Sequence, residues 1–109
     1  MNPKEAKEGI QRLQVMEQNV QALGMQKQQF QAQLFEVDGA LKELETSSSG
    51  YKIIGGIMIS TDKSALRSEL EGKKEVLEVR VQSLEKQEKQ LHDKLKKLQE
   101  EVLSSVNKE

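Results

Sequence analysis

The residue types that most often carry catalysis or metal binding are sparse in this sequence. His92 is the only histidine and cysteine is absent, which excludes thiol chemistry, disulfides and cysteine-based zinc sites. Asp and Glu number 18, but acid–base catalysis needs a carboxylate in a concave, dry pocket, which an open helical rod lacks. Gly55-Gly56 lacks the lysine–serine pair that follows the glycines of a phosphate-binding loop. We expect a solvated His92, no enzyme, no cofactor and no metal site.

Apolar residues outside the regular helical pattern are candidates for binding instead. Ile10, Val15 and Met25 lie off or beside the apolar stripe of the first half. Leu103 and Val106 continue the apolar character of the second half. In so polar a chain, such flexible side chains favour adaptable contact with apolar partners, although imperfect heptads and a frayed end are the alternative. The residues expected to make these contacts are Ile10, Leu13, Leu98, Val102, Leu103 and Val106.

One stretch, residues 47–62, separates two long polar segments and differs from both. Short bulky runs at 51–54 and 57–59 flank Gly55-Gly56, and each run is too short for a helix. Both glycines can take a positive φ, as a primed two-residue turn requires. The stretch therefore predicts a β-hairpin. Its expected pairs are Ile54 with Ile57, Ile53 with Met58, Lys52 with Ile59, and Tyr51 with Ser60.

Both faces of this hairpin are largely apolar. A two-stranded hairpin is marginal in water, and its edges offer unpaired N–H and C=O groups to another strand. We therefore expect the hairpin to join other chains. The alternative is a connector folded back onto its own helices, which would have to bury both faces against a thin helical pair. The residues predicted to mediate oligomerisation are Tyr51, Ile53, Ile54, Ile57, Met58 and Ile59.

The segments on both sides of the hairpin carry apolar residues in alternating steps of three and four. A first helix is predicted from Asn2-Pro3 to about Glu45, with Asn2 as its cap, and a second follows Thr61 or Asp62. Strict heptads of this kind are typical of a left-handed coiled coil. The two stripes are Leu13, Met16, Val20, Leu23, Lys27, Phe30, Leu34, Val37, Leu41 and Leu44, and Leu70, Lys74, Leu77, Val81, Leu84, Glu88, Leu91, Leu95, Leu98 and Val102.

The segments match in length and the connector is short, which favours an antiparallel helical hairpin within one chain. In that register Leu41 lies level with Leu70, and Leu13 with Leu98. A parallel dimer that uses the five heptad leucines of the second segment is the alternative.

Polar and glycine positions interrupt the seam far from the hairpin. Lys27 and Glu88 fall one layer apart, and we interpret them as two charges that snorkel to water rather than as a pair. Gly9 and Gly24 each destabilise the helix by about 1 kcal/mol relative to alanine at the same position. This end of the coiled coil is therefore expected to be the looser one.

Composition limits the remaining classes of function. Hydrophobic residues make up 35% and aromatic residues 3% of the 109 residues, which argues against a compact core. Lys and Arg number 17 and are interspersed with the acidic residues, so no basic footprint for nucleic acid appears. No apolar run approaches about 18 residues and the N-terminus has no signal pattern, so we expect no membrane contact and a cytoplasmic location.

Helix, single hairpin and helix together resemble the β-class subunit of archaeal prefoldin over nearly the whole chain. The family's turn glycine is usually followed by asparagine, whereas Gly56 follows Gly55 here, and either pair can turn. The related subunit 6 of the eukaryotic complex also has one hairpin and remains an alternative. The segments that carry the resemblance are residues 24–29 (GMQKQQ), 51–56 (YKIIGG), 71–75 (EGKKE) and 83–91 (SLEKQEKQL).

The resemblance implies a hexamer of two α-class and four β-class subunits, joined through their hairpins into a β-barrel that carries the coiled coils as tentacles. It further implies that the tips hold non-native proteins without ATP and pass them to a group II chaperonin. The α class has two hairpins, and the connector here has room for one. A structural coiled-coil adaptor is the first alternative function and a helical-arm RNA-binding module the second.

The expected fold class is mainly α, a long antiparallel helical hairpin with one β-hairpin. It forms a single domain. Its parts are an N-terminal coiled-coil helix at 1–46, a linker and hairpin at 47–62, and a C-terminal coiled-coil helix at 63–109.

Overall fold

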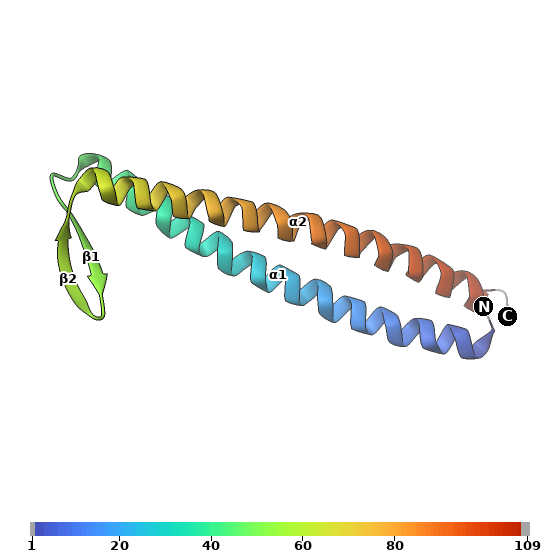
Figure 1. The fold of residues 1–109 in the computed structure, drawn as a ribbon. Helices are drawn as coiled ribbons and strands as arrows, with labels where there is room; N and C mark the ends of the chain where they lie inside the picture. Colours follow the sequence, from blue (N-terminus) through green and yellow to red (C-terminus); the bar gives the residue numbers. More distant parts are fainter. Residues whose placement is uncertain (1, 108–109) are drawn as a thin grey trace. The chain divides into compact units, whose positions relative to one another are not determined.

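The computed structural model describes residues 2–107, and of Val106 and Asn107 it describes the backbone only. Figure 1 shows two long helices and a two-stranded antiparallel sheet that lies between them in the order of the chain. The predicted fold, two long helices with one hairpin between them, is confirmed. In chain order the elements are α1 (Pro3–Thr46), β1 (Gly50–Ile54), β2 (Ile57–Thr61) and α2 (Lys63–Asn107).

The chain divides into two compact units, and each pairs part of α1 with part of α2. The terminal unit comprises Met1–Gln28 and Gln82–Glu109, and the hairpin unit comprises Gln29–Val81. Each unit has a thin core along the seam between its helical segments, because a pair of helices buries only one stripe of each. The buried apolar side chains are Val37, Leu44, Leu77 and Val81 in the hairpin unit, and Leu84, Leu95, Leu98 and Val102 in the terminal unit.

Both helices begin at side-chain caps. The Asn2 Oδ1 atom accepts a 2.8 Å hydrogen bond from the Glu5 N–H, and the Glu5 carboxylate accepts one in return from the Asn2 N–H. This reciprocal capping box satisfies amides that the first turn of a helix leaves unpaired. At α2 the Ala65 N–H donates to Asp62 Oδ2 at 3.2 Å, so Asp62 rather than Thr61 provides the cap.

Lys63 joins the end of α1 to the start of α2. Its Nζ donates to the Ser47 carbonyl at 2.7 Å and to the Glu45 carbonyl at 3.3 Å. Carbonyls at a helix C-terminus lack helical partners and carry partial negative charge, so an ammonium group there satisfies both needs. The Ser47 hydroxyl also donates to the Ser49 carbonyl at 2.7 Å, a local bond that competes with further helix. These contacts fix where α1 ends and α2 begins.

The hairpin has the predicted register. Ile54 pairs with Ile57, Ile53 with Met58, Lys52 with Ile59, and Tyr51 with Ser60. Gly55 has a φ of 57° and Gly56 a φ of 79°, and no non-glycine residue of the described chain has a positive φ. Two positive φ values in a row define the turn whose twist matches that of the strands.

One prediction about the seam was wrong. Lys27 and Glu88 do not snorkel separately to water, because the Lys27 Nζ lies 3.2 Å from Glu88 Oε2 and both side chains are largely buried. Lys74, the polar seam residue of the hairpin unit, also forms an ion pair: its Nζ lies 2.9 Å from Asp38 Oδ1. The hydrogen bond to the Asp38 carboxylate, followed by its charge, raises the pKa of Lys74.

We predict that the turn depends on its backbone conformation. Replacing both Gly55 and Gly56 with alanine should depopulate the hairpin, because a left-handed conformation costs an L-residue about 1–2 kcal/mol. The conservative control is Gly55→Asn, since asparagine visits this region readily. The measurement is the cross-strand Hα–Hα contact between Ile53 and Met58 in nuclear magnetic resonance. An equally strong contact in the alanine variant would contradict this reading of the turn.

Candidate functional site

The six large apolar side chains of the hairpin are all exposed to solvent. Their exposed fractions range from 45% for Ile59 to 73% for Ile53. We call them the hairpin surface. Its members are Tyr51, Ile53, Ile54, Ile57, Met58 and Ile59.

The hairpin surface occupies both faces of the sheet. Because side chains alternate along a strand, Ile54, Ile57 and Ile59 share one face and Tyr51, Ile53 and Met58 share the other. In the hairpin unit neither set is covered by the helices, so the alternative of a connector packed onto its own helices does not hold. Apolar side chains gathered on a short sheet with two open edges are typical of a protein interaction site.

The base of the hairpin is anchored to the helices of its unit. Gly50 is buried, and a Cβ at this position would lie 2.8 Å from Leu66 Cδ2 and 3.6 Å from Leu44 Cδ1. Lys52 reaches from β1 to α2, where its Nζ lies 2.7 Å from Glu69 Oε2. The close approach at Gly50 and the Lys52–Glu69 ion pair therefore hold the first strand while the rest of the hairpin projects into solvent.

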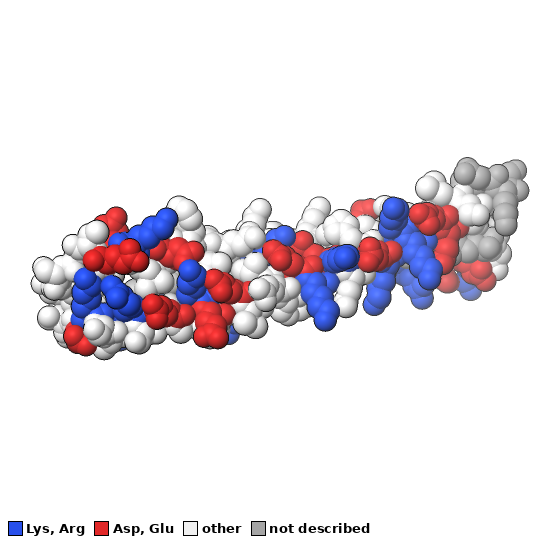
Figure 2. Space-filling model, turned by 90° about the horizontal axis from the view of Figure 1, so that it is seen from above, with Lys and Arg blue, Asp and Glu red and all other residues white. Residues whose placement is uncertain are grey.

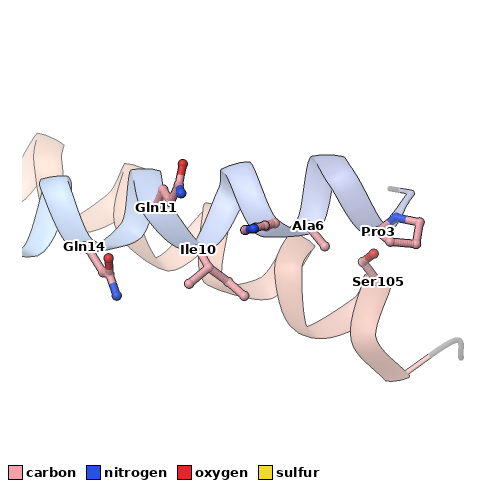
Figure 3. Close-up of a pocket in the computed structure, with 7 residues that line it drawn as sticks. Pro3, Ala6, Ile10, Gln11, Gln14 and Ser105 are labelled. Atoms are coloured by element: carbon pink, nitrogen blue, oxygen red, sulfur yellow. The ribbon is translucent and has the colours of Figure 1, made fainter.

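A second apolar feature, the terminal groove, lies in the terminal unit between the start of α1 and the end of α2. Its volume is about 450 Å³. Figure 3 shows the side chains that line it, all from α1 except Ser105 of α2. The apolar members are mixed with glutamines that can donate and accept hydrogen bonds. The lining residues are Pro3, Ala6, Lys7, Ile10, Gln11, Gln14 and Ser105.

The residues predicted to contact apolar partners occupy different environments. Ile10 and Leu103 are exposed, at 45% and 60%. Leu13 is half-buried, and the seam covers Leu98 and Val102. The side chain of the sixth, Val106, lies outside the described part of the chain. Of the five whose side chains the structure describes, only Ile10 lines the terminal groove. The two buried residues become available only where the seam opens.

Three exposed apolar side chains were missed by the sequence analysis. Phe35 is 81% exposed, and Val76 and Val79 are also largely exposed. Each lies off the heptad stripe, Phe35 directly after Leu34 and Val76 directly before Leu77. Counting every apolar residue away from a heptad position, rather than those near the chain ends, would have found them. All three belong to the hairpin unit.

Charges of both signs are mixed on the face of the molecule that Figure 2 shows. In Figure 2 lysine and arginine alternate with aspartate and glutamate over the visible face. Among residues 2–107, no group of three or more histidine, cysteine, aspartate and glutamate side chains is placed to hold a metal ion. In the same part of the chain, neither helix has a stretch long and apolar enough to cross a membrane.

A family model described as prefoldin subunit matches residues 7–109. The chain belongs to the prefoldin subunit family. Membership gives it a role associated with chaperone function and assembly with other prefoldin subunits. The family consists of chaperone subunits and not of known enzymes.

Relatives named prefoldin subunit beta confirm the resemblance to the β class. The protein from Thermococcus onnurineus is 40% identical over 93 residues, which cover 83% of this chain and 80% of the relative. The protein from Methanosarcina acetivorans is 38% identical over 107 residues, which cover 95% and 92%. The crystal structure of the prefoldin beta subunit from Thermococcus strain KS-1 matches with a TM-score of 0.90 and 35% identity, over 96% of this chain and 95% of that one.

We predict that assembly with other prefoldin subunits depends on the hairpin surface. Changing Ile53 and Ile57, one from each face, to aspartate should abolish oligomers, because a charge cannot be buried at a dry strand interface. The helices should persist, since neither residue contributes to the seam. Light scattering reports the oligomer and circular dichroism the helices.

The matched control is Phe35→Asp, which changes an exposed apolar residue of the same unit outside the hairpin. This variant should assemble normally. An Ile53→Asp/Ile57→Asp variant with the mass of the unmodified assembly would show that the hairpin is not the interface.

Proposed function

We propose that this chain is the β-class subunit of a cytoplasmic prefoldin hexamer with two α-class and four β-class subunits, and that it acts as an ATP-independent holdase. The hairpins of the six subunits form a shared β-barrel. The terminal units bind non-native proteins and pass them to a group II chaperonin. The archaeal β class is favoured over eukaryotic subunit 6, because the archaeal relatives above match most of the chain.

The observation that carries the proposal is the exposure of both apolar faces of the hairpin. The helices bury part of their own apolar stripes against each other in each unit. The hairpin is not covered in this way. In the described part of the chain its two faces are exposed to solvent, and neither outer strand edge pairs with a further strand. Pairing with strands of other subunits satisfies the edges and covers the faces at the same time.

The terminal groove supports binding of non-native chains. An unfolded protein offers apolar side chains together with unpaired backbone groups, and the groove offers Ile10 beside the amides of Gln11 and Gln14. Partial burial of one aliphatic side chain contributes on the order of 1 kcal/mol, at about 25 cal/mol per Å². One terminal unit therefore binds weakly and without strong selectivity.

Several terminal units on one assembly would raise the overall affinity. Once one unit holds a client, the others meet it at a high effective concentration, so weak contacts combine without any new one. Each contact still opens rapidly by itself. Such binding keeps apolar segments from aggregating and releases them without nucleotide hydrolysis.

We predict that Ile10 and Leu103 contribute directly to client binding. Changing both to serine should reduce suppression of the aggregation of a denatured model protein by assemblies reconstituted with an α-class subunit. Both side chains are exposed, so the seam should keep its stability. Turbidity measures the suppression, and removal of residues 1–10 and 100–109 should abolish it while the subunits still assemble.

The control is Val76→Ser/Val79→Ser, which removes two exposed aliphatic side chains of α2 in the hairpin unit. Its assemblies should protect as well as the unmodified ones. Full protection by the Ile10→Ser/Leu103→Ser variant and by the truncated chain would place client binding elsewhere, most simply on the inner face of the barrel. A structural adaptor would fail to suppress aggregation in every version.

We also predict that stability is graded along the helices. The terminal unit contains Gly9, Gly24 and the largely buried Lys27–Glu88 pair in or beside its seam, whereas the polar seam residue of the hairpin unit, Lys74, pairs with Asp38 nearer the surface. Amides near Ile10 and Val106 should therefore exchange hydrogen fastest, since local opening follows local packing. Hydrogen exchange with mass spectrometry measures this. Uniform protection along both helices would exclude a loosened terminal unit.

A further inference from the structure

The Lys27–Glu88 ion pair lies within the apolar seam of the terminal unit. The two side chains are 25% and 19% exposed, the lowest exposures of any ion pair in the described part of the chain. The Lys27 Nζ also donates a hydrogen bond to Glu88 Oε2 at 3.2 Å. Both residues occupy heptad positions that the neighbouring layers fill with leucine, valine or phenylalanine.

The pair is poorly suited to add stability. The second carboxylate oxygen, Glu88 Oε1, is buried without a hydrogen-bond partner among the described residues. Gly24 of α1 lies opposite this oxygen, which would be 4.0 Å from a Cβ at that position, and glycine has no side chain that could donate a hydrogen bond to it. Replacing a buried ion pair of this kind with well-packed apolar residues is often neutral or stabilising. Stability therefore does not explain why charged residues occupy these two heptad positions.

The two charges disfavour pairing between like helices, α1 with α1 or α2 with α2 from two chains. In a parallel pair of α2 helices from two chains, equivalent heptad positions face each other. Glu88 would then face the Glu88 of a second copy, and Lys74 would face another Lys74. A pair of α1 helices would place Lys27 against Lys27. Pairing α1 with α2 instead brings Lys27 beside the opposite charge of Glu88.

Lys27 and Glu88 also disfavour a register in which α1 is shifted along α2. Leucines recur every seven residues in α2 from Leu70 to Leu98, so a slip of one heptad still sets apolar residues against each other. The same slip would move Lys27 to Leu95 or Val81. It would move Glu88 to Leu34 or Val20. Both charges would then be buried without a partner, which is strongly unfavourable.

We propose that Lys27 and Glu88 specify pairing, selecting α1 with α2 in the observed register over pairs of like helices. A chain that carries a zipper-like leucine repeat and an interface for other subunits is exposed to such errors whenever several copies come together. The ion pair lets the hairpins associate while the helices remain paired within their own subunit. The role is independent of client binding.

A cysteine reporter tests the proposal, because the chain has no cysteine of its own. Leu91→Cys places one thiol on the α2 seam, so pairing of two α2 helices raises the yield of disulfide-linked dimer above that from random collisions. We would introduce it into the full chain with the native pair, with Lys27→Leu/Glu88→Leu, and with the exchanged pair Lys27→Glu/Glu88→Lys. Adding Val20→Cys provides a second reporter, since Val20 falls level with Leu91 in the register that the heptads predict.

The native and exchanged pairs should give little dimer from the single thiol and efficient closure within the chain from the two thiols. The leucine variant should melt at an equal or higher temperature, yet give the linked dimer as a major product and lose part of the closure within the chain. The single change Lys27→Glu should lower the melting temperature, and the exchange should restore it. A leucine variant with no more dimer than the native pair, or an exchanged pair with as much dimer as the leucine variant, would overturn the proposal.

Discussion

The hairpin between the two helices cannot satisfy its own interactions, and this constraint organises the rest of the molecule. A sheet of two strands has two open edges, and here the side chains on both of its faces are apolar and exposed. The close contact at Gly50 and the Lys52–Glu69 ion pair hold its base without covering it. A surface of this kind is marginal in water by itself, which agrees with assembly with other prefoldin subunits.

The helices have the opposite property, because each finds its partner within the same chain. Their seam is thin, and it includes the Lys27–Glu88 ion pair. Both charges would be hydrated at lower free-energy cost on the surface than in the seam. In our proposals, such a seam gives up some stability in return for correct pairing and for a terminal unit that can open. On the proposed function, weak contacts at the terminal groove then hold a non-native chain because several copies act together.

Sequence patterns that depend on local geometry predicted the fold well. The heptad stripes located both helices, and the glycine pair fixed the turn and hence the register of every strand pair. The fate of Lys27 and Glu88 was mispredicted, since whether two charges pair or separate depends on side-chain rotamers that heptad positions do not determine. The terminal groove was also beyond reach, because it depends on how closely Ala6 and Ser105 approach across two segments distant in sequence. Phe35 was missed because it lies off the heptad stripe and far from the chain ends, where exposed apolar side chains were expected.

Hydrogen exchange at single-amide resolution, on the chain alone and mixed with an α-class subunit, tests the central claim most directly. In a hairpin with a two-residue turn, alternate amides point away from the partner strand. Here these are the amides of Tyr51, Ile53, Met58 and Ser60. They should exchange rapidly in the isolated chain and become strongly protected in the assembly, because strands of other subunits pair with them. An assembly of full mass in which these four amides still exchange rapidly would contradict the account.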